Sequence, residues 1–154
     1  MERFQFYKPT VSNIADMQSL VLDDVNNGNI LDRSSSEMAT TIRSYTVVYH
    51  ENQIVGFVAL HIHTTSLAEI RSLVVHPEYR GNGIGSELVL KAISEAKQLD
   101  LKKILVLTYQ QKLFEKFDFN VIEKESIPEN KIWLDCVKCK HFPVCDEIAL
   151  IKEI

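Results

Sequence analysis

One segment constrains the fold of this chain more than any other. An apolar, strand-like run ends at Val75, glycines stand at positions 81, 83 and 85, and a long amphipathic helix follows over residues 82–99. Glycines let the backbone approach a bulky anion. The first N–H groups of a helix have no intrahelical acceptor, so they point at a ligand with the helix dipole behind them. The segment therefore predicts an anion-binding cradle, to which Arg80 adds a charge-assisted donor.

The spacing of these glycines excludes the common nucleotide-binding loops. No Gly-Lys-Ser/Thr sequence completes a P-loop, and the dinucleotide pattern G-x-G-x-x-G requires glycine at position 86, where Ser86 stands. The structural alternative is a tight helix entry that binds nothing. Alternating glycines beside an arginine are a poor solution for simple capping, so we favour the anion cradle.

The remaining periodicity predicts one α/β domain over residues 1–154 with a cysteine-containing segment at 131–154. Ser12 is the predicted N-cap of the first helix. The expected strands are residues 4–8, 45–50, 54–63, 67–75, 103–108, 121–125 and 147–152, and the expected helices are residues 12–25, 36–44, 82–99 and 111–116. Strand, long helix and strand over 67–108 form a βαβ unit, while 45–63 reads as an antiparallel hairpin. We therefore expect a mixed, mostly antiparallel sheet of six or seven strands flanked by about four helices.

The composition of the chain limits the kinds of partner that it can be expected to bind. The chain has a formal net charge of −4 over 154 residues, so it lacks the basic surface that nucleic acid or anionic lipid requires. No apolar run approaches membrane-spanning length, and the N-terminus lacks the apolar core of a signal peptide. We expect a cytoplasmic protein with a small-molecule partner, no nucleic acid and no membrane.

All three cysteines lie close together, at Cys136, Cys139 and Cys145. With His141 they could complete a tetrahedral zinc site, although the spacing is tight. Cysteines also pack as small, inert apolar residues, and we favour this alternative. We therefore expect no metal and regard the three thiols as weak zinc candidates.

The sequence Arg80-Gly81-Asn82-Gly83-Ile84-Gly85 resembles the coenzyme-binding motif of the GNAT superfamily, R/Q-x-x-G-x-G/A. The resemblance implies the GNAT fold and acetyl-CoA as co-substrate, with its pyrophosphate on the amides of residues 81–86. It also implies that the pantetheine arm runs along the preceding strand. The implied coenzyme-binding residues are Leu73, Val74, Val75, Arg80, Gly81, Asn82, Gly83, Ile84, Gly85 and Ser86.

Acyl transfer to an amine requires a base, because amino groups are mostly protonated at neutral pH. Glu69 is the candidate. Strict strand alternation places Leu67, Glu69, Arg71, Leu73 and Val75 on one face, so the carboxylate is expected to point toward the coenzyme cleft. The alternative is that Glu69 only pairs with Arg71, its neighbour on that face.

A narrower resemblance extends over nearly the whole chain, to the acetyltransferase domain of N-acetylglutamate synthases in their short, free-standing form. It rests on Ile30-Leu31-Asp32-Arg33-Ser34, Ala68-Glu69-Ile70, Leu107-Thr108 and Ile127-Pro128-Glu129-Asn130-Lys131. The resemblance implies Glu69 as base and Thr108 as the group that assists the thiolate or orients the acceptor. Arg33 and Lys131 are the implied cations for substrate carboxylates, and Arg71 joins them as a third candidate. Without the resemblance, Arg33 and Lys131 could equally be surface residues.

The chain departs from the superfamily pattern at two positions. Phe114 stands where many relatives have the tyrosine that protonates the thiolate, and Asp118 replaces a glycine. The proton would then come from Thr108, Tyr109 or water, or no acid would be needed.

The expected function is acetyl transfer from acetyl-CoA to the α-amine of a small amino acid, with L-glutamate and arginine biosynthesis favoured. The alternatives are another amino acid, a polyamine or a peptide N-terminus as acceptor, or a non-catalytic module that senses acetyl-CoA. A homodimer is compatible with the sequence, which does not fix the oligomeric state.

Overall fold

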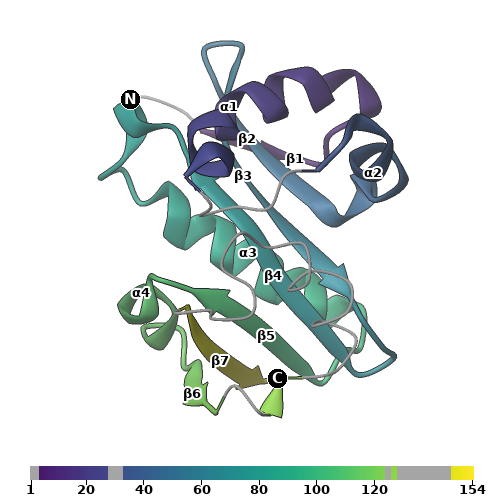
Figure 1. The fold of residues 1–154 in the computed structure, drawn as a ribbon, viewed down its shortest axis with the longest axis vertical. Coiled ribbons are helices and arrows are strands. Elements are labelled where there is room, and N and C mark those ends of the chain that lie inside the picture. The colour runs from purple at the N-terminus through teal and green to yellow at the C-terminus, as the bar shows by residue number, and fades with distance from the viewer. Residues whose placement is uncertain (1–3, 28–32, 124–125, 128–146) are drawn as a thin grey trace.

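The computed structural model describes residues 4–27, 33–123, 126–127 and 147–154. These residues form a seven-stranded sheet in the order β1-β2-β3-β4-β5-β7-β6, in which only β4 and β5 are parallel (Figure 1). The strands are β1 (Gln5–Tyr7), β2 (Tyr45–His50), β3 (Gln53–Ile62), β4 (Leu67–Val75), β5 (Lys103–Thr108), β6 (Asn120–Ile122) and β7 (Ile148–Glu153). The α-helices of the described part are α1 (Ile14–Asn26), α2 (Ser35–Thr40), α3 (Ile84–Gln98) and α4 (Gln111–Glu115). The mixed, mostly antiparallel α/β architecture is confirmed.

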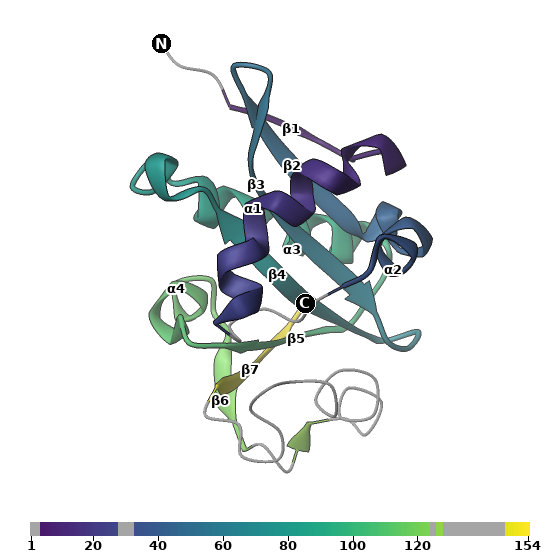
Figure 2. The ribbon, with the colours of Figure 1, turned by 45° about the horizontal axis from the view of Figure 1, so that its top comes forward.

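Helices cover both faces of the sheet. Helices α1 and α2 lie on one face and α3 on the other (Figure 2). Strand β3 shows the two-residue alternation that this arrangement requires. Phe57 and Ala59 of β3 belong to the same buried cluster as Met17 of α1. Val58 points to the opposite face, where it belongs to the cluster that contains Leu88 of α3. No helix of the described part is both long and apolar enough to cross a membrane.

The segments with the clearest periodicity fold as predicted. Strands β4 and β5 have the expected bounds, and every apolar residue on the predicted face of α3 is buried. The β2–β3 hairpin turns at Glu51 and Asn52, whose φ angles are 52° and 63°. Positive φ at both central residues is typical of a type I′ turn, whose backbone twist matches the right-handed twist of the two strands it connects.

The start of the first helix differs from the prediction. Ser12 does not cap it, because a 3-10 turn over Val11–Asn13 precedes α1 and contains Ser12. Thr10 is the N-cap of that turn, and its backbone N–H donates to Asn13 Oδ1 over 2.8 Å. The Asn13 side chain therefore takes over part of the capping role expected of the serine.

The alternation predicted for β4 is wrong beyond Arg71. Ala59 pairs with Arg71, but Phe57 pairs with Val74, so β4 holds one extra residue at this point. Ser72 absorbs it with a φ of 58°, the local signature of a bulge. As a result, Arg71 shares the α1/α2 face with Ala59, whereas Val75 pairs with Gly56 and lies on the α3 face.

The crowded surroundings of Gly56 on β3 give a stability prediction. A Cβ added at Gly56 would lie 2.8 Å from the Val74 carbonyl oxygen and 3.0 Å from Val48 Cγ1. We expect Gly56→Ala to lower the free energy of unfolding by roughly 1–3 kcal/mol, because backbone cannot move aside cheaply. Urea denaturation of the wild type and the variant measures the difference in unfolding free energy.

Gly85→Ala is the matched control, since its Cβ would meet Val75 Cγ2 only at an ordinary 3.8 Å. Its unfolding free energy should be unchanged or up to about 1 kcal/mol higher, because alanine favours helix. Equal stability of the two variants would contradict the crowding at Gly56.

Candidate functional site: a cleft between diverging strands

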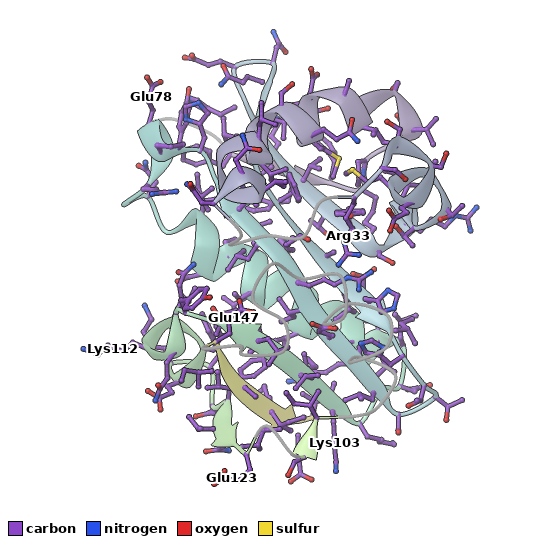
Figure 3. All side chains as sticks on the ribbon, in the orientation of Figure 1. Arg33, Glu78, Lys103, Lys112, Glu123 and Glu147 are labelled. Atoms are coloured by element: carbon purple, nitrogen blue, oxygen red, sulfur yellow. The ribbon has the colours of Figure 1, made fainter. Side chains whose placement is uncertain are left out.

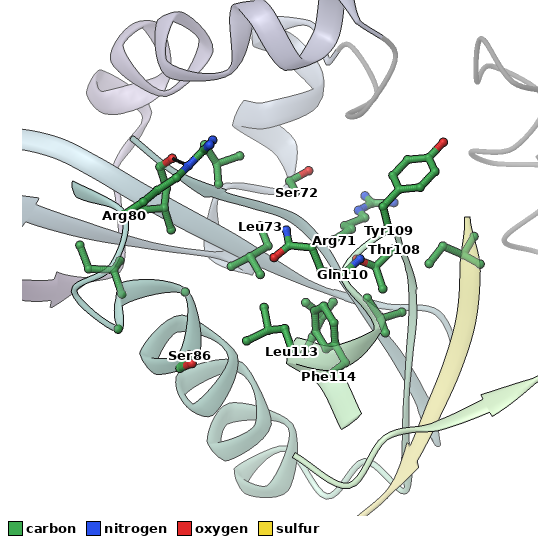
Figure 4. A pocket seen from close by; sticks show the side chains of 18 of the residues that line it. Arg71, Ser72, Leu73, Arg80, Ser86, Thr108, Tyr109, Gln110, Leu113 and Phe114 are labelled. Atoms are coloured by element: carbon green, nitrogen blue, oxygen red, sulfur yellow. Dashed lines mark hydrogen bonds between the residues drawn. The ribbon is translucent and has the colours of Figure 1, made fainter. Parts of the chain in front are cut away.

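A cleft of about 640 Å³ opens where β4 and β5 separate. The two strands pair only from Leu67 to Ile70 of β4, opposite Lys103 to Val106 of β5. Beyond that point β5 continues to pair with β7 alone, because Leu107 and Thr108 are opposite β7 residues. The cleft is lined by the end of β4, the glycine loop, the first turn of α3, the end of β5 and α4 (Figure 4).

The end of β4 therefore has a strand on one side only. Val74 and Val75 pair with β3, while the opposite edge of this stretch faces the cleft. Backbone N–H and C=O groups along a strand edge form a ready template for another extended chain. An extended ligand that carries amide groups can occupy the place that β5 leaves.

The glycine loop joins this edge to α3. Gly81 and Gly83 have φ angles of 87° and 77°, which L-residues rarely adopt. A Cβ at either position would meet no atom within 4 Å, so the backbone conformation, and not a shortage of space, calls for glycine. Gly83 is the N-cap of α3 and no side chain caps the helix, so its first amides lie at the cleft without an intrahelical acceptor.

Two polar side chains tie the loop to its surroundings. Arg80 Nε donates to the Val75 carbonyl oxygen over 3.4 Å, which keeps the guanidinium at the cleft (Figure 4). Asn82 Nδ2 donates to the Tyr79 carbonyl oxygen over 2.8 Å. Asn82 does not line the cleft, so its side chain shapes the loop and does not face a ligand.

The end of β5 supplies the second wall. Thr108 Oγ1 accepts a hydrogen bond from the Gln110 backbone N–H over 2.9 Å, which leaves the hydroxyl proton free to be donated elsewhere. Phe114 also lines the cleft but is 1% exposed and packs edge-on against Phe119 at 5.3 Å. Asp118 has a φ of 68°, a left-handed backbone conformation that glycine adopts more readily than other residues.

Glu69 does not line the cleft, contrary to the prediction from strand alternation. Its side chain is 1% exposed and lies on the α1/α2 face, where it bonds His63 Nε2 over 2.9 Å. Its chain neighbours Ile70 and Arg71 do line the cleft. Glu69 is therefore adjacent in sequence to residues that line the cleft, but its own side chain is buried on the α1/α2 face.

Two arginines and a tyrosine gather on the same face. Tyr45, Ala59 and Arg71 form one row across β2, β3 and β4, and the small Ala59 leaves space between the two larger side chains. Burial raises the pKa of the Tyr45 phenol, while the positive charges of Arg33 and Arg71 oppose this shift. Arg33 therefore lies close to this row, between α2 and the sheet (Figure 3). Gln18 of α1 holds the Arg33 carbonyl through its Nε2 over 3.2 Å.

Four predicted residues lie outside the described part: Lys131, Cys136, Cys139 and Cys145. Their predicted roles are not tested. Within the described residues, no group of three or more His, Cys, Asp and Glu side chains could hold a metal ion.

The cleft also contains residues that sequence reasoning missed. They are Ser72, Tyr79, Leu113 and Glu147. Tyr109, one of the proton donors considered from the sequence, also lines the cleft and is 46% exposed. Glu147 reaches the cleft because it precedes β7, whose first residue pairs with Thr108. Only the strand pairing reveals this position, since Glu147 is far from the cleft in sequence.

The sequence profile of the Acetyltransferase (GNAT) family matches residues 20–119. This range contains the glycine loop, both diverging strands and α4. The chain therefore belongs to the GNAT family of acetyltransferases.

Its relatives include proteins with named activities. The chain is 39% identical over 127 residues to an uncharacterized N-acetyltransferase of Chlorobaculum tepidum, covering 82% of this chain and 81% of that protein. It is 28% identical over 121 residues to the amino-acid acetyltransferase of Aeromonas salmonicida, covering 77% of this chain. The match spans only 27% of that longer enzyme.

Solved structures share the fold. N-acetylglutamate synthase from Neisseria gonorrhoeae, complexed with coenzyme A and N-acetyl-glutamate, superposes with a TM-score of 0.85 at 18% identity, over 98% of this chain and 35% of that one. Rv2747 from Mycobacterium tuberculosis, in complex with CoA, superposes with a TM-score of 0.83 at 21% identity. The match covers 97% of this chain and 99% of that one.

The anion cradle gives a charge-based prediction. Ser86 lies in the first turn of α3 and lines the cleft (Figure 4). A carboxylate there suits the helix dipole, so Ser86→Asp should leave the free energy of unfolding unchanged or slightly higher. The same charge should repel a pyrophosphate and weaken coenzyme A binding about tenfold or more, with a smaller effect in high salt. Calorimetric titration measures both the affinity and its salt dependence.

Ser94→Asp places an identical charge on an exposed position of α3, away from the cleft. Its affinity for coenzyme A should match that of the wild type. Equal affinities of the Ser86 and Ser94 variants would place the pyrophosphate elsewhere.

Proposed function

We propose that this protein transfers acetyl from acetyl-CoA to the α-amino group of a small amino acid, with L-glutamate favoured. The observation that carries the proposal is the cleft between β4 and β5, which joins an open strand edge to the uncapped start of α3. One surface thus offers hydrogen bonds to an extended amide chain and, beside it, amides for an anion.

Acetyl-CoA has both chemical features. Its pyrophosphate fits the amides of residues 81–86 beside Arg80, and the amides of its pantetheine arm fit the open edge of β4 at Leu73, Val74 and Val75. The thioester would then lie toward the bulge, near Ser72 and Thr108, where the strands diverge. Structures of GNAT relatives with bound coenzyme A support this assignment.

The acceptor would lie on the α1/α2 side of β4. Arg33 and Arg71, both close to Tyr45, supply two guanidinium groups that can bind carboxylates in a bidentate manner. The raised pKa keeps the Tyr45 phenol neutral, and its hydrogen bond with Thr41 holds the ring beside the two guanidinium groups. A dicarboxylic amino acid matches this charge pattern, and Lys131 is retained as a third proposed cation.

The chemistry requires no covalent enzyme intermediate. The neutral amine attacks the thioester carbonyl, Glu69 accepts the amine proton through a water, and the C–S bond breaks as the carbonyl reforms. Thr108 can donate its hydroxyl hydrogen bond to the leaving thiolate, which finally takes a proton from solvent. Phe114 cannot supply that proton.

The biological setting is part of the proposal. Similarity to amino-acid acetyltransferases supports an amino-acid substrate. A role in arginine biosynthesis, in the cytoplasm, is the setting that we propose with it. A homodimer is compatible with this proposal, which does not depend on the oligomeric state.

The role of Glu69 is tested by Glu69→Gln, which keeps a side-chain oxygen for the bond to His63. Loss of the base should lower kcat about 10²–10⁴-fold, with little change in the KM for acetyl-CoA. Free-thiol release measures the rate. Glu123→Gln, at an exposed position after β6, is the control and should retain full activity. Equal rates for both variants would remove Glu69 from the reaction.

The acceptor is tested with a panel of amines. L-glutamate should be acetylated faster than neutral amino acids, polyamines or peptides, and Arg33→Gln should raise the KM for L-glutamate about tenfold or more, because one charge-assisted contact is lost. The KM for acetyl-CoA should stay constant. An active competitor beside inactive glutamate would overturn the substrate assignment.

A sensor of acetyl-CoA is the second candidate. Phe114 in the cleft and the buried position of Glu69 favour it, because neither presents a reactive group directly to the thioester. Tight coenzyme binding without turnover of any amine would establish the sensor and exclude the transferase.

A further inference from the structure

Two histidines lie close to Glu69 and Arg71 of β4. His61 is near the end of β3, and His63 directly follows that strand. His61 is directly opposite Glu69 in the strand register. The hydrogen bonds nevertheless run along the diagonals: Arg71 Nη2 donates to His61 Nδ1 over 3.0 Å, and His63 Nε2 bonds Glu69 Oε1 over 2.9 Å. The two imidazoles meet edge to face, with ring centroids 4.7 Å apart.

These contacts assign the protons on both rings. A guanidinium only donates, so His61 Nδ1 accepts and the ring proton is on Nε2. An ionised carboxylate only accepts, so His63 Nε2 must donate to Glu69. His63 Nδ1 is buried and has no hydrogen-bond partner among the described residues. An unpaired buried acceptor is better tolerated than an unpaired buried N–H, which again places the His63 proton on Nε2.

Burial makes the contact between His63 and Glu69 stronger than a surface pair. Both side chains are 1% exposed, so water screens the interaction little. A buried carboxylate without a donor would favour its neutral form, which cannot accept a proton. The bond from His63 favours the ionised form and fixes the direction in which the remaining oxygen lone pairs point.

We propose that His63 is a positioning residue for acetyl transfer, which holds the Glu69 carboxylate ionised and in a fixed orientation for the amine proton. The inference rests on the proposed role of Glu69 as the base. Because Glu69 is 1% exposed and does not line the cleft, the proposed proton path to it runs through a water, and a small rotation of the carboxylate would break that path. His63 keeps its own Nε2 proton throughout, and Glu69 passes the amine proton on to solvent before the next turnover.

The test compares two substitutions at one position. His63→Phe keeps a planar ring but removes the donor, and it should lower kcat about tenfold or more at an unchanged KM for acetyl-CoA. His63→Gln retains an amide N–H donor and should recover most of the rate. Combined with Glu69→Gln, His63→Phe should cause no further loss, because a residue that acts through Glu69 has nothing left to position.

Nitrogen NMR of the His63 imidazole in the intact wild type keeps the test independent of how the variants fold. We expect Nε2 of the ring to carry a proton. A proton on Nδ1 instead, an unchanged kcat in His63→Phe, or additive losses in the double variant would each overturn the inference while leaving the transferase standing. Wild-type protein that acetylates no amine would refute the proposed function itself, and the role of His63 with it.

Discussion

The site depends on the left-handed backbone of one serine. Ser72 inserts an extra residue into β4, just after β4 stops pairing with β5. A non-glycine residue with positive φ is uncommon and strained, and such residues concentrate at functional sites. The bulge lies where one edge of β4 opens to the cleft, and it exchanges the faces of the residues on either side.

That exchange separates two kinds of chemistry along a single strand. Before the bulge, Glu69 and Arg71 lie on the α1/α2 face with Tyr45 and two histidines. After it, Val75 lies on the α3 face, beside the glycine loop. Acidic, basic and proton-accepting groups therefore gather on one side of the strand, and the groups suited to an extended coenzyme on the other. A strand without the bulge would place both sets on the same side.

The parts of the fold that could be predicted are those with local signatures. The six-residue apolar face of α3, the alternating glycines and the Asn52 turn each follow from a periodicity or a backbone preference that neighbouring residues express. The bulge could not be predicted, because serine carries no preference for positive φ. The bond from His63 to Glu69 and the arrival of Glu147 at the cleft depend on strand register, which is a property of distant segments.

The open edge of β4 lies in the interior of the sheet, with β5, β7 and β6 beyond it and β3, β2 and β1 behind it. Unpaired strand edges at the perimeter of a sheet invite other chains to add a strand and so begin aggregation. Here β5 still joins β4 at the base of the gap, so a foreign polypeptide cannot align along the whole strand. The fold thus keeps reactive backbone available to a slender ligand while it denies that backbone to the broader β-strand of a neighbouring molecule.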